Sequence, residues 1–122
     1  MNATTMLLRQ IHPSFVQSGR VTSQAFSPFP KDYGKLSVYD GDLIDAEPAF
    51  QHSTTHLEYQ SKGVLGVTVR ECSEVGLPAE SDPEPFLEHA IVDFTGKDKK
   101  SIKSCAAVLR DRGMTRGWLY SD

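Results

Sequence analysis

The sequence has few cysteines, no long apolar run and no excess of basic residues, and each shortage excludes a class of protein. Its two cysteines, Cys72 and Cys105, cannot form a disulfide-rich scaffold, and we expect buried thiols on two different helices. The longest apolar stretches, such as residues 64–69 and 90–94, are far shorter than the roughly 20 residues that span a bilayer. With 13 basic and 16 acidic residues the net charge is −3, so the broad cationic field of nucleic-acid-binding proteins is missing.

The chain also lacks the short motifs that identify common enzyme classes. It contains no GxxxxGKS/T, no GxGxxG after a predicted strand, no GxSxG, no HExxH and no paired CxxC. Residues 1–10 have no basic residue before their apolar part and no small-residue cleavage site, which is not typical of a secretion signal. We therefore expect a cytoplasmic protein without a membrane anchor, whose function none of these motifs reveals.

What the chain does have is the composition of one ordinary folded domain over residues 1–122. Hydrophobic residues make up 39% and charged residues 24% of it, and no internal repeat or linker interrupts it. Its alternating and helical patterns predict elements in this order: extended segments 6–11 and 20–26, strand 35–39, a helix from Asp45 to about residue 60, strand 63–69, helical turn 70–75, strand 88–94, helix 98–112 and strand 117–120. This order predicts an α+β fold with a mixed or antiparallel sheet of five to six strands and two to three helices packed on it.

Several of these elements carry a specific expectation. Residues 63–69 are continuous and β-branched, which predicts a central strand buried on both faces. In helix 98–112, apolar residues recur at helical spacing and Gly113 is expected to end the helix. Residues 27–34 and 79–85 are rich in proline, so we expect them to be loops.

Polar residues near the ends of the first three extended segments form the first candidate site. They are Arg9, His12, Thr22, Ser23, Gln24, Ser37, Tyr39 and Asp40. If these segments are neighbours, a guanidinium, an imidazole and several hydroxyls converge, which suits a ligand that carries phosphate or ribose. The alternative is structural: Arg9 pairs with Asp40 or Asp42 on the surface, and the hydroxyls bond to turns.

Three further candidate sites are supported by fewer residues of the sequence. Glu88 and His89 follow an acidic, proline-rich loop, and a carboxylate at Glu88 suits a general base or a ribose ligand, or is simply solvated. His52 and His56 stand four residues apart on a predicted helix, but a metal site needs a third ligand, so we predict no metal. Neither cysteine has a base beside it in the sequence, which argues against a nucleophilic role.

The first half of the chain resembles a known family. Residues 8–13, Gly19-Arg20 with Thr22-Ser23, and residues 36–39 leading towards Phe50 resemble the opening of RES-type domains of the ADP-ribosyltransferase-like superfamily. The resemblance implies a split cleft for NAD⁺ if the first and third strands are adjacent. It further implies that Arg9 or His12, then Ser37 or Tyr39, then Glu88 line that cleft.

Two functions from different classes follow from these patterns. The first is an NAD⁺-consuming enzyme of a toxin or defence system, with Arg9, His12, Tyr39 and Glu88 as catalytic residues and Thr22, Ser23 and Ser37 as residues that bind NAD⁺. The second is a non-catalytic interaction protein, such as an antitoxin, an immunity protein or an accessory subunit. It would bind a protein partner through the proline-rich loops and their aromatic residues, which are Phe26, Phe29, Tyr33 and Phe86.

Overall fold

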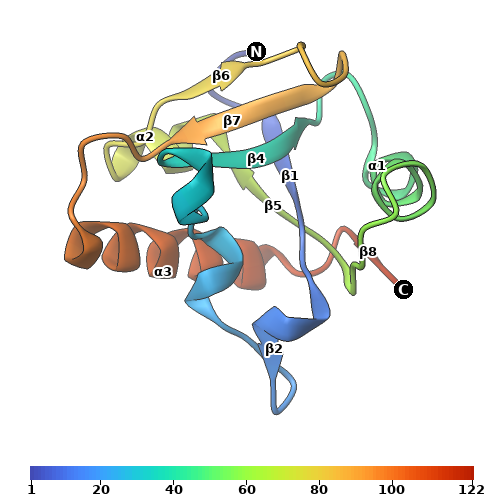
Figure 1. Ribbon diagram of the computed structural model, residues 1–122, viewed down its shortest axis with the longest axis horizontal. Helices are drawn as coiled ribbons and strands as arrows, with labels where there is room; N and C mark the ends of the chain where they lie inside the picture. The colour runs from blue at the N-terminus through green and yellow to red at the C-terminus, as the bar shows by residue number, and fades with distance from the viewer.

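Six strands form one antiparallel sheet at the centre of the computed structural model, which describes residues 1–122 (Figure 1). In spatial order they are β6 (Ala79–Ser81), β7 (His89–Asp93), β4 (Lys35–Asp40), β1 (Met6–Gln10), β5 (Gly63–Thr68) and β8 (Tyr120–Ser121). Two short strands, β2 (Val16–Gln17) and β3 (Arg20–Val21), pair separately. Every pairing is antiparallel, so the predicted α+β fold with an antiparallel sheet is confirmed.

Three α-helices and four short helical segments surround the sheet. The α-helices are α1 (Ala46–Gln51), α2 (Val69–Glu74) and α3 (Lys99–Arg116); the 3-10 helices are η1 (Pro13–Phe15), η2 (Ser23–Phe26) and η3 (Pro30–Asp32), and a π-helical segment η4 (His52–His56) extends α1. Side-chain caps fix two helix starts, because Thr68 accepts from the Glu71 N–H and Asp98 accepts from the Ser101 N–H. None of the helices is both long and apolar enough to cross a membrane.

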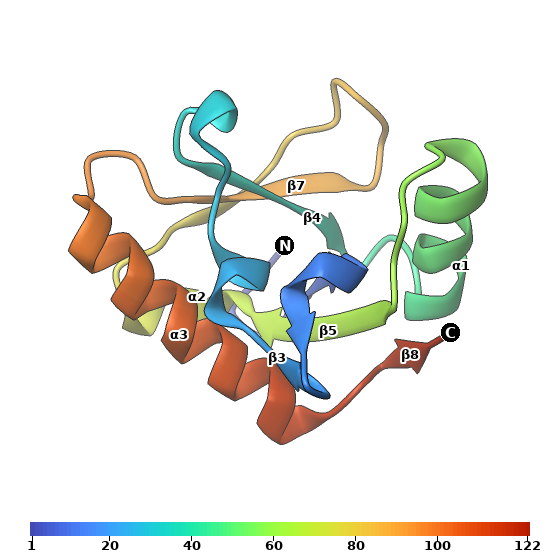
Figure 2. The ribbon, with the colours of Figure 1, turned by 60° about the horizontal axis from the view of Figure 1, so that its bottom comes forward.

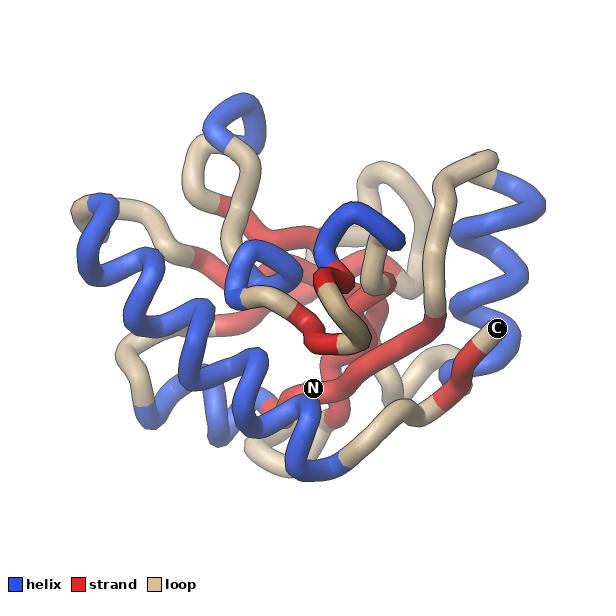
Figure 3. The backbone as a smooth tube through the Cα atoms, turned by 90° about the horizontal axis from the view of Figure 1, so that it is seen from below, coloured by secondary structure: helices blue, strands red, loops and turns tan.

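The two faces of the sheet bury two separate groups of side chains. Alternation along β1 sends Leu7 into a core of 18 buried residues and Leu8 into a cluster of five. The larger core packs against α3 and η2, while the smaller cluster includes Phe50 of α1. Figures 2 and 3 show α3 and α1 well apart, with η1 and η2 between them in the view of Figure 3.

Three predicted elements differ from the structure. Only residues 20–21 of the expected extended segment 20–26 form a strand; residues 23–26 turn into η2, which places both Ala25 and Phe26 in the core. Residues 79–81 are an edge strand rather than loop, because they pair with β7 while Glu80 and Ser81 stay exposed. The last strand is residues 120–121, shorter and later than expected.

Helix α3 also continues beyond its expected end at Gly113. It runs to Arg116 and ends at Gly117, whose φ of +92° favours glycine. Gly113 is instead a point of close packing, since a Cβ there would lie 3.4 Å from Phe26 Cζ. The buried character of β5 is confirmed, although the two middle strands of the sheet are β4 and β1.

The sheet opens between those two middle strands. β1 pairs with β5 over all five of its residues, and β4 pairs with β7 from Lys35 to Tyr39. By contrast, β1 and β4 pair only at Leu7 with Asp40 and at Leu8 with Tyr39. Beyond Leu8 and Tyr39 the two halves of the sheet separate, which leaves room for side chains between them.

Candidate functional site

A cavity of about 600 Å³ lies where β1 and β4 separate. Its walls come from the end of β1, the middle of β4, segments 12–15 and 28–32, the chain around η4, and residues just before β7. The lining mixes apolar and aromatic side chains with a few polar groups, which is the usual make-up of a small-molecule site. Four of the seven predicted site residues line it: Arg9, His12, Ser37 and Tyr39.

The other three predicted residues lie elsewhere. Thr22 and Ser23 line a separate hollow of about 840 Å³ beside the start of α3, together with Lys99 and Lys103. Glu88 is half-buried and lines neither space, although its carboxylate is close enough to Tyr39 to raise the pKa of that phenol. The structure therefore brings the residues of β1 and β4 together without Thr22, Ser23 or Glu88.

Arg9 occupies the gap that opens between the strands. Its Nε donates to the Ala25 carbonyl of η2 at 2.8 Å and its Nη1 donates to the Ser37 carbonyl of β4 at 3.0 Å. Burial lowers the pKa of Arg9 to about 10, against the opposing effect of the Asp32 carboxylate, so the side chain stays positively charged at neutral pH. The expected alternative, a surface pair with Asp40 or Asp42, is wrong: Arg9 bonds to main-chain carbonyls instead.

Tyr39 belongs to an aromatic group on another wall of the cavity. Its hydroxyl lies 2.7 Å from His52 Nδ1, and its ring centroid is 5.2 Å from that of Phe86. Burial raises the pKa of Tyr39 to about 12; a hydrogen bond with Ser53 opposes this shift and the Glu88 charge adds to it. The phenol is therefore neutral at pH 7 and serves as a hydrogen-bonding and stacking group.

His12 is held by the start of η1. Its Nδ1 accepts from the Ser14 N–H at 3.0 Å and lies 2.8 Å from Ser14 Oγ, so the imidazole caps this 3-10 turn. The ring packs edge-on against Phe15 at 6.1 Å. This arrangement fixes the side chain at the cavity wall through Nδ1 and leaves Nε2 without a hydrogen-bond partner in the protein.

A second histidine, His89, connects β4 to the segment before β7. Its Nε2 lies 3.1 Å from Ser37 Oγ, and its Nδ1 lies 2.9 Å from the Asp82 carbonyl and 3.3 Å from Asp82 Oδ2. Both Ser37 and His89 line the cavity. The sequence predicts that His89 lies beside Glu88 at the start of a strand. Its contacts with Ser37, 52 residues away, and with Asp82, seven residues away, could not be predicted from the sequence pattern. One polar residue in the otherwise apolar start of β7 is the only signal that could have marked it.

The remaining candidates are the His52 and His56 pair and the two cysteines. The rings of His52 and His56 stack with centroids 5.4 Å apart, and no group of three or more histidine, cysteine, aspartate or glutamate side chains could hold a metal ion. Both cysteines are buried and free, as expected. Burial raises the pKa of Cys72 to about 12, with a further rise from the Glu71 charge, so this thiol stays protonated at neutral pH.

Comparison of the chain with protein-family models, with curated proteins and with solved structures finds no match. Any function must therefore be argued from the cavity itself.

Proposed function

We propose that this chain is a small NAD⁺-consuming enzyme, of the kind found in toxin or defence systems, and that NAD⁺ binds in the cavity between β1 and β4. The observation that carries the proposal is that Arg9, His12, Ser37 and Tyr39 line one cavity at the point where two adjacent strands separate. A split between these strands is what the resemblance to ADP-ribosyltransferase-like domains requires. A cytoplasmic location, which we also propose, would give the chain access to this metabolite.

The charges of the cavity suit the pyrophosphate of a dinucleotide. Arginine carries five N–H donors, and Arg9 uses two of them for the Ala25 and Ser37 carbonyls. The remaining donors can bind phosphate oxygens, and Lys31 adds a second cation to the lining. Tyr39 and Phe86 supply an aromatic wall against which the nicotinamide ring can pack.

The ribose carries positive charge as nicotinamide leaves, and a carboxylate stabilises that charge. The sequence predicts Glu88 for this role. Glu88 does not line the cavity, so it would have to act from its position near Tyr39. Asp32 is the carboxylate that does line it. Nicotinamide release by the Glu88→Gln and Asp32→Asn variants distinguishes the two: equal release by Glu88→Gln and wild type removes Glu88 from the mechanism.

Binding of NAD⁺ to the purified protein, measured by titration calorimetry, tests the proposal directly. Arg9→Gln removes the positive charge and with it a charge-assisted contact to the pyrophosphate. We expect this variant to bind NAD⁺ about 10-fold more weakly than the wild type, or weaker still. Arg20→Gln is the matched control, since Arg20 is an exposed arginine outside the cavity. No binding by the wild type, or equal weakening by both variants, would contradict the proposal.

A protein partner is the second candidate function, and the exposed tip of residues 27–34 favours it. Tyr33 is 85% exposed and Phe29 47% exposed, whereas Phe26 is fully buried and cannot contact a partner. Tyr33 also has a φ of +54°, a costly conformation for a residue with a side chain. A photo-crosslinking residue at position 33 should capture one defined protein in cells, while the same residue at Tyr59, 64% exposed, should not.

A further inference from the structure

Ser37, His89 and Asp82 form a continuous hydrogen-bonded chain beside the cavity. Ser37 lies on β4, His89 begins β7, and Asp82 directly follows the edge strand β6. The distances are 3.1 Å from Ser37 Oγ to His89 Nε2, and 2.9 and 3.3 Å from His89 Nδ1 to the carbonyl and Oδ2 of Asp82. A hydroxyl, an imidazole and a carboxylate in this order are the parts of an activated serine nucleophile.

Asp82 determines which nitrogen of His89 carries the proton. A main-chain carbonyl can only accept a hydrogen bond, so Nδ1 must donate, and the proton lies on that nitrogen in the neutral ring. The unprotonated Nε2 then faces Ser37 Oγ and can accept the hydroxyl proton. The nearby Asp82 carboxylate stabilises the imidazolium that forms.

The histidine of this hydrogen-bonded group is buried and the serine is exposed, as a serine nucleophile with a shielded base requires. His89 is 8% exposed and packs edge-on against Phe86, so the base is shielded from water and held in place. Ser37 belongs to the exposed residues of β4, so its hydroxyl is open to a substrate. Arg9 contacts the main chain of Ser37, because its Nη1 donates to the carbonyl of that residue.

A second serine and histidine in the same cavity do not have these properties. Ser14 Oγ lies 2.8 Å from His12 Nδ1, but that nitrogen already accepts the Ser14 N–H, and no carboxylate contacts the ring. The pair is explained by its capping of η1. Ser14 therefore serves as an internal control for Ser37.

We propose that Ser37 is a nucleophile activated by His89 and Asp82, and that the cavity hydrolyses a small carboxylic ester. Ser37 Oγ attacks the ester carbonyl while its proton passes to His89 Nε2. The carbon–oxygen bond to the alcohol breaks, the alcohol takes the proton from His89, and an acyl-serine remains. Water then attacks the acyl group, gives its proton to His89, and releases the acid as Ser37 recovers its proton. The proposal goes beyond the proposed function, because it requires neither NAD⁺ nor Glu88.

Labelling by a fluorophosphonate probe tests the proposal. The probe forms a phosphorus–oxygen bond to an activated serine and loses fluoride, and peptide mass mapping identifies the residue that is modified. We expect one label per wild-type molecule, on Ser37, and none on Ser37→Ala. His89→Gln should label at least about 100-fold more slowly, since it lacks the base. Ser14→Ala should label at the wild-type rate.

Other results would overturn the proposal. They are a folded wild type that takes no label, a label on Ser14 or another residue, and a His89→Gln variant that labels as fast as the wild type. Mapping on the wild type needs no variant, so the test holds even if His89→Gln does not fold. The probe contains no nucleotide, so its failure leaves the NAD⁺ binding test unaffected, and a failure of that test does not affect the labelling.

Discussion

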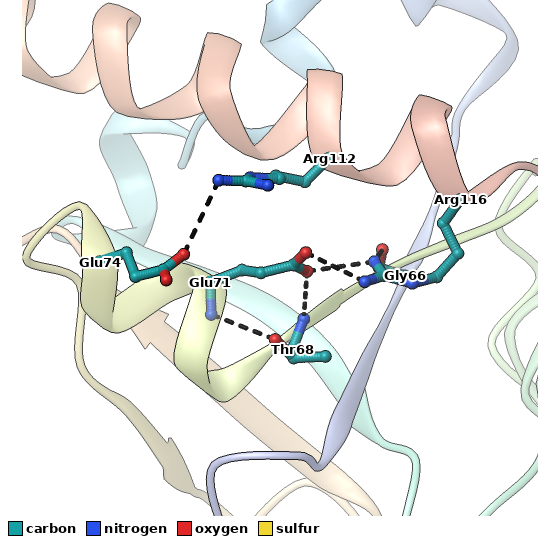
Figure 4. A network of polar contacts seen from close by, with 6 residues as sticks. All are labelled: Gly66, Thr68, Glu71, Glu74, Arg112 and Arg116. Carbon is teal, nitrogen blue, oxygen red and sulfur yellow. Dashed lines mark hydrogen bonds and ion pairs between the residues drawn. The ribbon is translucent and has the colours of Figure 1, made fainter.

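At the scale of single residues, the Glu71 carboxylate accepts three hydrogen bonds (Figure 4). Its Oε1 accepts from the Thr68 N–H and from Arg116 Nη1, and its Oε2 accepts from Arg116 Nη2 at 3.0 Å. Arg116 also donates to the Gly66 carbonyl at 2.7 Å. One carboxylate therefore caps α2 and connects the end of α3 to β5.

We predict that Glu71→Gln lowers the free energy of unfolding by about 1 kcal/mol at pH 7, because it keeps the cap but loses the charge that Arg116 pairs with. Burial of Glu71 raises its pKa, but the bonds from Arg116 and Thr68 outweigh burial, and the net pKa is lowered. A lowered native pKa stabilises the fold above the unfolded value of about 4.3 and loses that effect as the pH falls through the native pKa. The difference between the two proteins, measured by urea unfolding, should therefore shrink below about pH 4.

Glu74 provides the matched control. Its carboxylate lies 3.8 Å from Arg112, and both side chains are more than half exposed. Glu74→Gln should change the free energy of unfolding by less than about 0.5 kcal/mol at any pH. An equal loss from both variants would show that Glu71 acts as an ordinary surface charge.

At the scale of elements, Gly113 of α3 and Gly66 of β5 differ in the space that surrounds them. Gly113 sits inside α3, where glycine costs about 1 kcal/mol relative to alanine. A Cβ there would lie 3.4 Å from Phe26 Cζ and 3.5 Å from Leu65 Cβ, which is ordinary contact. We predict that Gly113→Ala raises the free energy of unfolding by about 0.5–1 kcal/mol in denaturant titration.

Gly66 of β5 should behave in the opposite way. A Cβ there would lie 2.6 Å from Leu119 Cδ1 and 2.7 Å from Met6 Sδ, so both side chains would have to move. We predict that Gly66→Ala lowers the free energy of unfolding by about 1–3 kcal/mol. If both alanine variants were stabilising, side chains around Gly66 would have to repack without cost.

Elements also show how far sequence patterns reach. Alternation predicts β1, β4 and β7, a continuous β-branched run predicts β5, and helical spacing predicts α3, because each pattern reports the burial of a single segment. Segment 20–26 alternates like a strand, but tertiary packing buries the consecutive residues Ala25 and Phe26. The cavity depends on contacts remote in sequence: the β1–β4 register that stops at Leu8, and the contact of Arg9 with Ser37. Sequence reasoning could therefore name the residues of β1 and β4 but could not exclude Thr22, Ser23 or Glu88.

At the scale of the whole molecule, the two buried clusters share their strands. Val38 and Leu65 belong to the larger core, while their chain neighbours Tyr39 and Val64 belong to the smaller cluster on the opposite face. Neither cluster can lose its packing while the strands of the other stay ordered. The molecule should therefore unfold as one cooperative unit, despite its two separate cores.

We predict that unfolding gives one transition with the same midpoint by two probes. Trp118, the single tryptophan, lies next to β5 and reports on the β8 edge by fluorescence, while far-UV circular dichroism reports on all helices and strands. Leu109→Ala removes a fully buried side chain of α3 from the larger core and should cost about 2–5 kcal/mol. Because the strands couple the two clusters, this distant change should lower both midpoints equally. If it moved the circular dichroism midpoint and left that of Trp118 in place, the two faces of the sheet would unfold independently.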